Sequence, residues 1–473
     1  MKRHSYLLIL LSIFWSCSTT DPIKIQGNTE SELSVTIFFI NDQHGQLENF
    51  SKIKHIVDQE KLINPVLLTA SGDMFSGNPV VDNHAQKGYP MIDLMNDVGF
   101  DIALLGNHEF DYGEEILRDR MNQSNFDWVC ANVDMSASVI PQTASVKVLN
   151  AGDLKIAFLG LVETNGKEGD IIPSTHPWRV QNLTFQRHQD IVQDYANVKL
   201  EEDADVLIAL THIGTGRDFQ LAEDYSFFDM ILGGHSHQVV EDESNGIPIF
   251  QTGSYLNNLG RVRLVIEDKT IQEYEYELIN LNSYSEIDET VQQKINTYND
   301  QSGLDDVIGY SDRYHGKSNV GCFYTDALRS EMNVNLTFQN TGGIRNSLDE
   351  GDILVREIYE IDPFNNGSIS YTMSVADVVS FLKNGQGLYY SGMEIQQEGQ
   401  SILIKNLEGE ALASNENITI GINDYIAAVN DDYFPSGGVT KPFTTAEALI
   451  NYLNNNSESI NYPDCQRYFR YDN

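Results

Sequence analysis

Side chains that bind metal ions follow several short apolar runs of this chain. Imidazole, carboxylate and amide groups occur there together, and this combination suits divalent transition metals better than calcium. The chain has 11 histidines, and chance placement would hardly bring five of them into these segments. The candidate ligands are Asp42, His44, Asp73, Asn107, His212, His235 and His237. Taken together, they predict a binding site for two metal ions.

Three of these residues indicate how the ions are bound. Asp42 and His44 alternate across Gln43, so in an extended segment both side chains project to the same side and can share one ion. Asp73 can bridge two cations because its carboxylate has two oxygens, and a metal pair ~3.5–4 Å apart requires such a bridge. Alone, each residue is more often structural, because Gly-Asp pairs form turns and polar groups are common at strand ends. The combination favours a dinuclear site.

The candidate ligands stand at the ends of predicted β-strands. The apolar runs are 35–40, 66–70, 102–105, 156–161, 206–210 and 230–232, with helical stretches between them. Near-continuous apolar strands of this length are typical of a sheet that is covered on both faces. In open α/β sheets, ligands bind beyond the carboxyl ends of the strands. Since five of the six runs end in a candidate ligand, we expect an α/β domain with the site at that edge.

The order and spacing of these segments resemble the calcineurin-like metallophosphoesterases, and within them the 5'-nucleotidase / UDP-sugar hydrolase family. The most specific motif is Gly-Asn-His-Glu at 106–109. The resemblance implies two divalent metal ions, and the ligand types fit Zn, Mn, Co or Fe. It assigns Asp42, His44, Asp73 and His237 to one ion, and Asp73, Asn107, His212 and His235 to the other.

The resemblance also implies a catalytic pair. His108 corresponds to the family's catalytic histidine, and Asp111 corresponds to its acidic partner. A cationic His108 beside the scissile phosphate would stabilise the developing charge and protonate the leaving oxygen, while Asp111 orients the ring. In this chemistry the metal ions activate a water molecule, so no covalent nucleophile from the protein is needed. We therefore expect His108 to be catalytic rather than a ligand.

The resemblance covers nearly all of the mature chain and implies an α/β fold class. It predicts an N-terminal metallophosphoesterase sandwich of two β-sheets flanked by helices, and a C-terminal α+β substrate-binding domain. Val291, Ile295 and Tyr298 stand at helical spacing and predict a linking helix between the two. The expected boundaries are 1–17 for a lipoprotein-type signal peptide, 33–281 for the catalytic domain, 282–305 for the linking helix and 306–473 for the C-terminal domain.

The C-terminal half carries the predicted substrate contacts. Residues 340–345, Asn-Thr-Gly-Gly-Ile-Arg, resemble a family segment in which Asn340 and Arg345 would contact the substrate. Phe364 matches one side of the family's base-stacking clamp, and Tyr425 matches the other. Stacking is worth about 1–3 kcal/mol per base for purines and pyrimidines alike, so we expect little discrimination between bases.

Two segments depart from the family pattern. Where the family has Gly-Gly-Asp-Gly, residues 429–432 read Val-Asn-Asp-Asp, which keeps Asp431 as a predicted substrate contact without flanking glycines. Upstream, residues 316–318, Gly-Lys-Ser, stand where the family has a second substrate-binding arginine. We therefore expect altered contacts with the substrate and unchanged metal chemistry.

Charge and length restrict the partners and the organisation of the protein. The formal net charge of −39 argues against polymeric nucleic acid, because a strongly acidic surface repels a polyanion. A small anionic nucleotide fits, since divalent cations reverse the local field inside a cleft. At 473 residues the chain exceeds a single-core domain of ~250–300 residues, so two domains are expected. The sequence leaves the oligomeric state open.

The N-terminus predicts export. Residues 1–4 are basic and residues 6–16 are apolar, as in a signal peptide, and the apolar stretch is too short to span a membrane. Cys17 precedes polar residues, as in a bacterial lipoprotein whose cysteine is acylated. We expect a protein of the periplasm or cell envelope that meets the membrane only through a lipid anchor at Cys17. The alternative is an ordinary cleaved signal with an incidental cysteine.

The three other cysteines allow at most one disulfide bond among themselves in an oxidising compartment. Cys322 and Cys465 are the expected pair because both lie in the second half of the chain. Cys130 lies in the apolar segment Trp-Val-Cys-Ala, where a buried thiol acts as a small hydrophobic side chain.

These observations favour an exported, metal-dependent phosphohydrolase that releases phosphate from 5'-nucleotides, with UDP-sugars as possible further substrates. A 2',3'-cyclic nucleotide phosphodiesterase/3'-nucleotidase is the alternative, because that sister group shares every metal ligand. An inactive surface binding protein ranks lower, because such a protein would not need His108 and Asp111.

Overall fold

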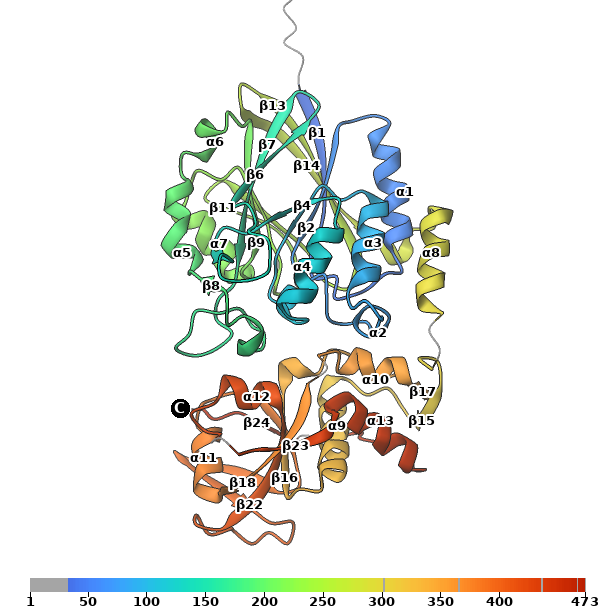
Figure 1. The fold of residues 1–473 in the computed structure, drawn as a ribbon, viewed down its shortest axis with the longest axis vertical. Helices are drawn as coiled ribbons and strands as arrows, with labels where there is room; N and C mark the ends of the chain where they lie inside the picture. Colours follow the sequence, from blue (N-terminus) through green and yellow to red (C-terminus); the bar gives the residue numbers. More distant parts are fainter. Residues whose placement is uncertain (1–32, 301–302, 365, 435–436, 466, 473) are drawn as a thin grey trace, which may run out of the picture. The chain divides into compact units, whose positions relative to one another are not determined.

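The computed structural model describes residues 33–300, 303–364, 366–434, 437–465 and 467–472. The predicted signal peptide, the tether that follows it and Cys17 lie outside these ranges. Residues Leu33–Asn473 form one compact unit. Its first half contains two six-stranded sheets and its second half contains one (Figure 1).

The first sheet has the strand order β14-β13-β1-β2-β3-β4. Its strands are β1 (Leu33–Ile40), β2 (Val66–Ser71), β3 (Ile102–Leu104), β4 (Asp127–Val129), β13 (Asn258–Glu267) and β14 (Thr270–Asn280). Strands β1 to β4 run parallel, whereas β13 and β14 add an antiparallel edge. The parallel register places the carboxyl ends of β1, β2 and β3 side by side.

The second sheet has the strand order β11-β12-β10-β9-β7-β6. Its strands are β6 (Val146–Ala151), β7 (Leu154–Val162), β9 (Val206–His212), β10 (Met230–Leu232), β11 (Val239–Ser244) and β12 (Ile247–Thr252). The four inner strands run parallel, and β6 and β11 pair antiparallel at the two edges. The predicted sandwich of two sheets is therefore confirmed.

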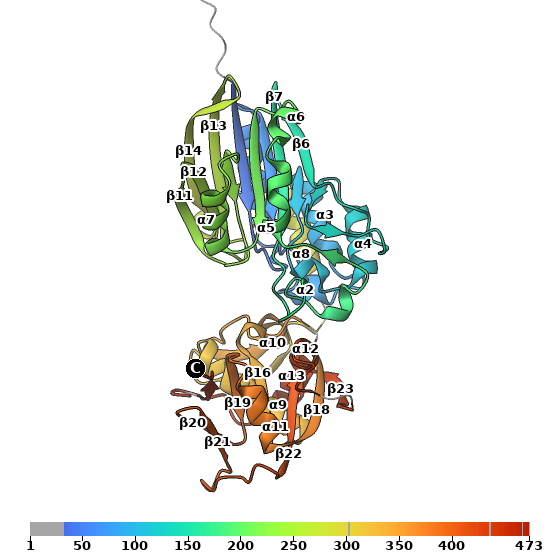
Figure 2. The ribbon, with the colours of Figure 1, turned by 90° about the vertical axis from the view of Figure 1, so that its left-hand side faces the viewer.

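Helices cover the outer faces of both sheets, α1, α3 and α4 on one side and α5, α6 and α7 on the other (Figures 1 and 2). The helices of this half are α1 (Phe50–Lys61), α2 (Pro79–Asp82), α3 (Tyr89–Val98), α4 (Glu114–Gln123), α5 (His188–Ile191), α6 (Val198–Glu201) and α7 (Thr215–Asp224). Alternate residues of β9 serve two cores. Ile208 and Leu210 pack between the sheets, whereas Leu207 and Ala209 pack in the core that includes Leu221 of α7. Burial on both faces explains the continuous apolar runs.

A shorter helix than predicted follows the sandwich. Helix α8 spans Glu289–Asn299, inside the expected range 282–305, because the side chain of Asp288 caps it by accepting a hydrogen bond from the N–H of Val291. Its Tyr298 hydroxyl donates to Asp93 of α3 at 2.7 Å, which fixes the helix to the sandwich. A small pair, β5 (Val133–Asp134) and β8 (Thr184–Phe185), completes this half of the chain.

The second half is built on a mixed sheet with the order β23-β18-β22-β16-β19-β24. Its strands are β16 (Leu336–Asn340), β18 (Gly367–Ser374), β19 (Leu388–Ser391), β22 (Asn417–Asn423), β23 (Val439–Thr444) and β24 (Tyr468–Phe469). Two further pairs are β15 (Val307–Ser311) with β17 (Gly351–Leu354) and β20 (Glu394–Glu398) with β21 (Ser401–Lys405).

Helices on both faces of this sheet close two separate cores. They are α9 (Lys317–Met332), α10 (Val355–Ile361), α11 (Val375–Leu382), α12 (Asp424–Val429) and α13 (Thr445–Asn455). Phe381 of α11 lies in one core, and Phe323 of α9 and Leu449 of α13 lie in the other. The predicted α+β C-terminal half is confirmed.

The cysteines behave as the sequence predicts. Cys322 and Cys465 form a disulfide bond, and Cys130 is free and buried. Burial raises the pKa of the Cys130 thiol to about 12, so it stays protonated. Within the described residues, no helix is long and apolar enough to cross a bilayer.

Candidate active site

The predicted metal ligands gather beyond the carboxyl ends of parallel strands from both sheets. Asp42 and Asp73 follow β1 and β2, and His212 ends β9. The ring nitrogen Nε2 of His212 lies 3.0 Å from Oδ2 of Asp73, and Nε2 of His237 lies 3.5 Å from Oδ1 of Asp42. Nδ1 of His235 lies 3.0 Å from Oδ1 of Asn107. The fold thus brings all seven predicted ligands into one cluster.

The backbone that carries these ligands is sharply turned, which corrects one expectation. Asp42 and His44 have φ angles of +54° and +48°, so they do not lie on an extended segment. Asp73, His235 and His237 also have positive φ, at +56°, +80° and +56°. Residues other than glycine rarely adopt this conformation, and in native structures it concentrates at functional sites. The two side chains share a site because of the turn and not because of strand alternation.

Two glycines let neighbouring loops approach the ligands closely. A Cβ atom on Gly72 would lie 2.7 Å from Nδ1 of His212. A Cβ atom on Gly234 would lie 2.9 Å from the same nitrogen. Any larger residue would push the His212 ring out of the cluster, so both positions require glycine.

The hydrogen bonds of the rings leave their inner nitrogens free to bind a cation. His44 Nδ1 lies 2.9 Å from the carbonyl oxygen of Ser76, and His212 Nδ1 lies 2.7 Å from that of Ser71. A carbonyl only accepts, so both Nδ1 atoms carry a proton and both Nε2 atoms carry a lone pair in the neutral rings. Nε2 of His212 is buried, and Oδ2 of Asp73 lies 3.0 Å from it, so both groups can bind the same ion. The donor set fits divalent metal ions.

Arg345 of the C-terminal half reaches this cluster. Its Nη2 lies 3.0 Å from Nε2 of His44 and 3.3 Å from Nε2 of His237. The guanidinium only donates, so both ring nitrogens act as acceptors. Burial and the nearby Arg345 lower the pKa of His237 to about 3, which keeps this ring neutral as a ligand must be.

The predicted catalytic pair is formed. His108 Nδ1 donates to Oδ2 of Asp111 at 2.6 Å, and the other carboxylate oxygen accepts a hydrogen bond from the hydroxyl of Thr175 at 2.8 Å. Burial opposes the cationic form of His108, but Asp73 and Asp111 raise its pKa. Burial alone would raise the pKa of Asp111, but His108 lowers it to about 2. His108 also lies within 4.8 Å of ligand atoms of His44 and Asp73, so its predicted catalytic role stays a prediction.

Glu109 has a role that the sequence did not reveal. Its fully buried carboxylate accepts hydrogen bonds from the backbone N–H groups of Asp73 (2.9 Å), Met74 (2.7 Å) and Gly106 (2.6 Å). Burial, together with the charge of Asp73, raises its pKa to about 7. Glu109 therefore ties the loop after β2 to the loop after β3. The Gly-Asn-His-Glu motif contained the residue, but its sequence position alone does not show which backbone it binds.

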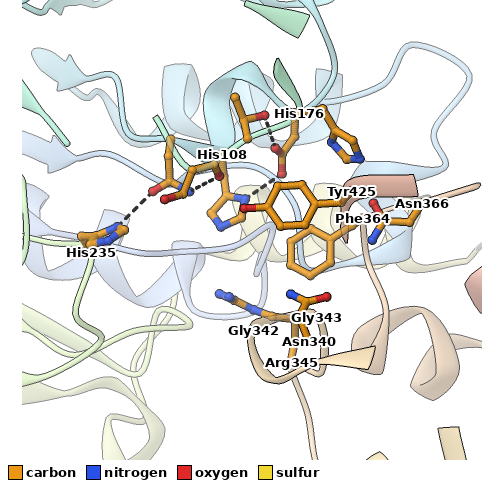
Figure 3. A pocket seen from close by; sticks show the side chains of 14 residues that line it. His108, His176, His235, Asn340, Gly342, Gly343, Arg345, Phe364, Asn366 and Tyr425 are labelled. Carbon is orange, nitrogen blue, oxygen red and sulfur yellow. Dashed lines mark hydrogen bonds and ion pairs between the residues drawn. The ribbon is translucent and has the colours of Figure 1, made fainter. Parts of the chain in front are cut away.

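A cavity of about 180 Å³ opens between the metal ligands and the C-terminal half (Figure 3). His235 lies at one end, His176 and Asn366 lie toward the other, and His108, Phe364 and Tyr425 lie between them. The lining residues are Asn107, His108, Asp111, Ser174, Thr175, His176, His235, Asn340, Gly342, Gly343, Arg345, Phe364, Asn366 and Tyr425. The four predicted substrate contacts Asn340, Arg345, Phe364 and Tyr425 are among them.

The aromatic side chains of the cavity pack on charged and polar neighbours. The Phe364 ring stacks on His108 with centroids 5.6 Å apart and an interplanar angle of 24°. The guanidinium carbon of Arg345 lies 5.6 Å from the centroid of the same ring. Tyr425 packs edge-on against His176, with centroids 5.4 Å apart. Flat, apolar faces therefore lie next to the His108–Asp111 pair.

The structure places one predicted substrate contact elsewhere. Asp431 is not among the residues that line this cavity, and its carboxylate pairs with the ammonium group of Lys167 at 3.0 Å. Both residues line a different, more polar cavity. Val429 and Asn430 replace the glycines that flank this acid in the family, and the side chain of Asn430 is bound to those of Asn384 and Gln386.

Sequence reasoning also missed part of the lining. Ser174, Thr175 and His176 lie in the loop after β7, which carries no strand-end motif. Asn366 follows the Pro-Phe segment by two residues and was not singled out. The one sequence feature that indicated this loop is Glu163, the acidic residue directly after β7. The apolar run of that strand, 156–161, is the one without a candidate metal ligand at its end.

Comparisons with known proteins agree with this arrangement. The family "Calcineurin-like phosphoesterase" matches residues 35–239, and the family "5'-nucleotidase, C-terminal domain" matches residues 299–436. Endonuclease YhcR of Bacillus subtilis is 27% identical over 84% of this chain, and the chain spans about a third of that protein, 36% of its length. A 5'-nucleotidase of Vibrio parahaemolyticus is 24% identical, and the match covers 91% of each chain.

The fold has a close relative among solved structures. The crystal structure of a 5'-nucleotidase precursor from Thermus thermophilus superposes with a TM-score of 0.80. The match covers 89% of this chain and 96% of the other, at 20% sequence identity. The two halves of the chain therefore share the arrangement of that protein.

Proposed function

We propose that this chain, which belongs to the calcineurin-like phosphoesterases with a 5'-nucleotidase C-terminal domain, is a metal-dependent phosphohydrolase that releases phosphate from 5'-nucleotides. One observation carries the proposal. A single cavity joins the cluster of metal-binding side chains and the His108–Asp111 pair to the aromatic rings of Phe364 and Tyr425. A 5'-nucleotide, in which a ribose links the phosphate to the base, needs a site that offers metal-binding side chains and aromatic rings together.

The metal-binding residues divide into two sets that share Asp73. Asp42, His44, Asp73 and His237 would hold one divalent ion, and Asp73, Asn107, His212 and His235 would hold the other. We propose Zn, Mn, Co or Fe, because imidazole nitrogens and carboxylates suit these metals. When bound, such a pair of ions supplies an activated water molecule and neutralises charge on the phosphoryl oxygens.

The side chains around the cluster supply the proton and the orientation. Nε2 of His108 is the free ring nitrogen, because Nδ1 is bound to Asp111, and it donates the proton to the leaving oxygen of the ester. Asp111 keeps the ring in the correct tautomer and favours its cationic form. The planar guanidinium of Arg345 binds phosphoryl oxygens, for which its paired donors are well suited.

The C-terminal half holds the nucleoside. Phe364 and Tyr425 offer apolar faces to the base, and stacking on them supplies affinity. Oδ1 of Asn340 accepts a hydrogen bond from Asn423, so its amide N–H groups stay available to the substrate. On sequence grounds we propose that the enzyme is exported and anchored through a lipid at Cys17, which lies outside the described residues.

Two observations favour a second candidate. Asp431, the predicted substrate contact, lies outside the cavity, and residues 316–318 lack the arginine that the family uses. A 2',3'-cyclic nucleotide phosphodiesterase/3'-nucleotidase would use the same metal ligands with different contacts to the ribose. UDP-sugars are further candidate substrates.

An assay that measures both free phosphate and the nucleotide products separates these possibilities, because the first hydrolysis of 2',3'-cyclic AMP or UDP-glucose yields phosphomonoesters and no free phosphate. The metal-loaded protein is incubated with AMP, 3'-AMP, 2',3'-cyclic AMP and UDP-glucose, and His108→Asn serves as the control for contaminating phosphatases. We expect AMP to be hydrolysed fastest. Hydrolysis of 2',3'-cyclic AMP without hydrolysis of AMP would support the second candidate. No hydrolysis of any phosphoester by metal-loaded protein would identify a binding protein instead.

A further inference from the structure

Hydrogen bonds fix the loop after β7 just upstream of the residues that line the cavity. The carboxylate of Glu163, which is 1% exposed, accepts hydrogen bonds from the backbone N–H groups of Asn165 (2.7 Å) and Ser174. Across the loop, the N–H of Gly166 donates to the carbonyl of Ile172 at 2.9 Å. These bonds fix both ends of the loop, so the residues that follow Ser174 have a defined position.

Two residues at the end of this loop contact the catalytic machinery. The carbonyl of Ser174 accepts a hydrogen bond from the side chain of Asn107 at 3.1 Å. The hydroxyl of Thr175 donates to Asp111 at 2.8 Å. The loop is therefore part of the active site, and its next residue is placed accurately relative to the catalytic pair.

That next residue, His176, lies at the far end of the cavity from His235 (Figure 3). It is 4% exposed, and the centroid of its ring lies 4.5 Å from the ring centroid of Trp178 and 5.4 Å from that of Tyr425. Nε2 of His176 lies 3.6 Å from Oδ1 of Asp424, the residue before Tyr425. Contacts from two halves of the chain thus hold this ring in place.

Polar atoms at this end of the cavity are buried without a partner. Nε2 of His176, Oδ1 of Asp424 and Oδ1 of Asn366 make no hydrogen bond to any described residue. An unpaired buried polar group is unfavourable, and native proteins keep few of them. Nε2 of His176 and Oδ1 of Asp424 face each other at 3.6 Å, whereas Oδ1 of Asn366, a residue that lines the cavity, is left for a ligand to complete.

The neighbouring carboxylate determines which nitrogen of His176 can accept a hydrogen bond. Of the two tautomers of a neutral ring, the Asp424 carboxylate that faces Nε2 favours the one that has its proton on this nitrogen. Nδ1 is then an acceptor, and it is the ring nitrogen that remains for a ligand in the cavity. Asn366 provides a further acceptor oxygen at the same end.

We propose that His176 determines the base specificity of the enzyme by accepting a hydrogen bond from the exocyclic amino group of the base. This inference rests on the proposed nucleotide phosphohydrolase function. This hydrogen bond makes 6-aminopurine and 4-aminopyrimidine nucleotides better substrates than their 6-oxo and 4-oxo counterparts. Asp424 acts as a positioning residue, because it affects the base only by determining which ring nitrogen of His176 carries the proton.

The proposal departs from the expectation of little base discrimination. Stacking on Phe364 and Tyr425 does not distinguish an amino group from an oxo group, since both bases have the same flat face. An oxo group, however, would turn its lone pairs toward the acceptor of His176 and leave it unpaired. A site built to bind a hydrogen-bond donor rejects the analogue that lacks it.

Two matched pairs of substrates test the proposal. AMP and IMP differ at position 6 of the purine, and CMP and UMP differ at position 4 of the pyrimidine. We expect the metal-loaded wild type to prefer the amino member of each pair by about ten- to hundredfold in kcat/KM. In His176→Phe, which keeps an aromatic ring but has no acceptor, both ratios should fall to within about twofold of one.

Asp424→Asn provides a second variant that changes only the positioning group. The amide no longer favours one tautomer of His176, so we expect the two ratios to fall by about three- to tenfold. His55→Phe on α1, whose ring packs near Tyr284 outside the cavity, is the matched control and should keep the wild-type ratios.

The outcomes separate this inference from the function on which it rests. If the wild type hydrolyses none of the four nucleotides, the proposed function is wrong. If it hydrolyses them and the ratios are near one, or if His176→Phe leaves them unchanged, His176 does not determine specificity. A preference for the oxo bases would also overturn the proposal, because Nδ1 would then act as a donor.

Discussion

The two ends of the active-site cavity are built in different ways. The metal end, which consists of the seven predicted ligands, comes from loops that directly follow strands of one sandwich. The base end, which consists of Phe364, Tyr425, His176 and Asn366, combines one loop of the sandwich with two segments of the C-terminal half. The predicted metal ligands thus lie on one rigid scaffold, whereas recognition of the base depends on contacts between segments that are far apart in the sequence.

The interactions at the two ends also differ in kind. At the metal end, buried carboxylates and imidazoles lie within hydrogen-bond distance of one another, and their inner nitrogens need a cation. At the base end, aromatic faces dominate, and Oδ1 of Asn366 and Nε2 of His176 make no hydrogen bond to any described residue. Substitutions at the metal end should therefore abolish activity, and substitutions at the base end should change affinity and selectivity in a graded manner.

The largest effect is expected for Asp73→Ala. This change removes the carboxylate shared by both sets of ligands, so we expect the protein to lose both metal ions and kcat to fall by about 10⁴-fold or more. Elemental analysis of the purified protein measures the metal content. Asp153→Ala, in the exposed turn between β6 and β7, should keep both ions. Full metal content in Asp73→Ala would contradict the bridging role.

His108→Asn should separate catalysis from metal binding. We expect about 10²- to 10⁴-fold lower kcat, because the variant lacks the proton donor, while the metal content stays that of the wild type. Elemental analysis and kinetics on the same preparation provide the measurement. Loss of metal in this variant would make His108 a ligand, which its position near His44 and Asp73 permits.

Glu109→Gln should have an intermediate effect. The new amide group would face backbone N–H groups that now donate to a carboxylate, so the loop that carries Asp73 should shift. We expect about 10- to 100-fold weaker metal binding, as for other residues that orient metal ligands. Titration with a chelator while activity is followed measures the affinity. Glu115→Gln on the exposed face of α4 is the control, and equal affinities in both variants would rule out the positioning role.

Phe364→Ala should have the smallest effect on the reaction itself. Loss of one stacking face should raise KM for AMP several-fold to about tenfold, while p-nitrophenyl phosphate, which has no base, should be affected little. Steady-state kinetics with both substrates tests this expectation, and Tyr314→Ala, an exposed aromatic residue, is the control. Equal losses for both substrates would instead indicate that Phe364 acts through its contact with His108.

The sequence by itself determined most of the metal end. The ligand types, their order and their positions after apolar runs were visible because each motif is local and because parallel strands bring their carboxyl ends to one edge. The family resemblance predicted the sandwich and the pairing of His108 with Asp111, whose side chains are joined by a hydrogen bond of 2.6 Å. The one error, an extended segment at Asp42 and His44, arose because strand alternation does not continue into a turn with positive φ.

The family resemblance supplied Phe364 and Tyr425, but only the tertiary structure decided the rest of the base end and the residues that position the ligands. Glu109 binds backbone from another loop, and His176 meets Asp424 from the other half of the chain. Asp431, which the motif placed at the substrate, pairs with Lys167 instead. Such contacts join segments that are far apart in the sequence, and no local period or spacing encodes them. They exist because packing of the two halves brings loops together, and that packing is a property of the whole chain.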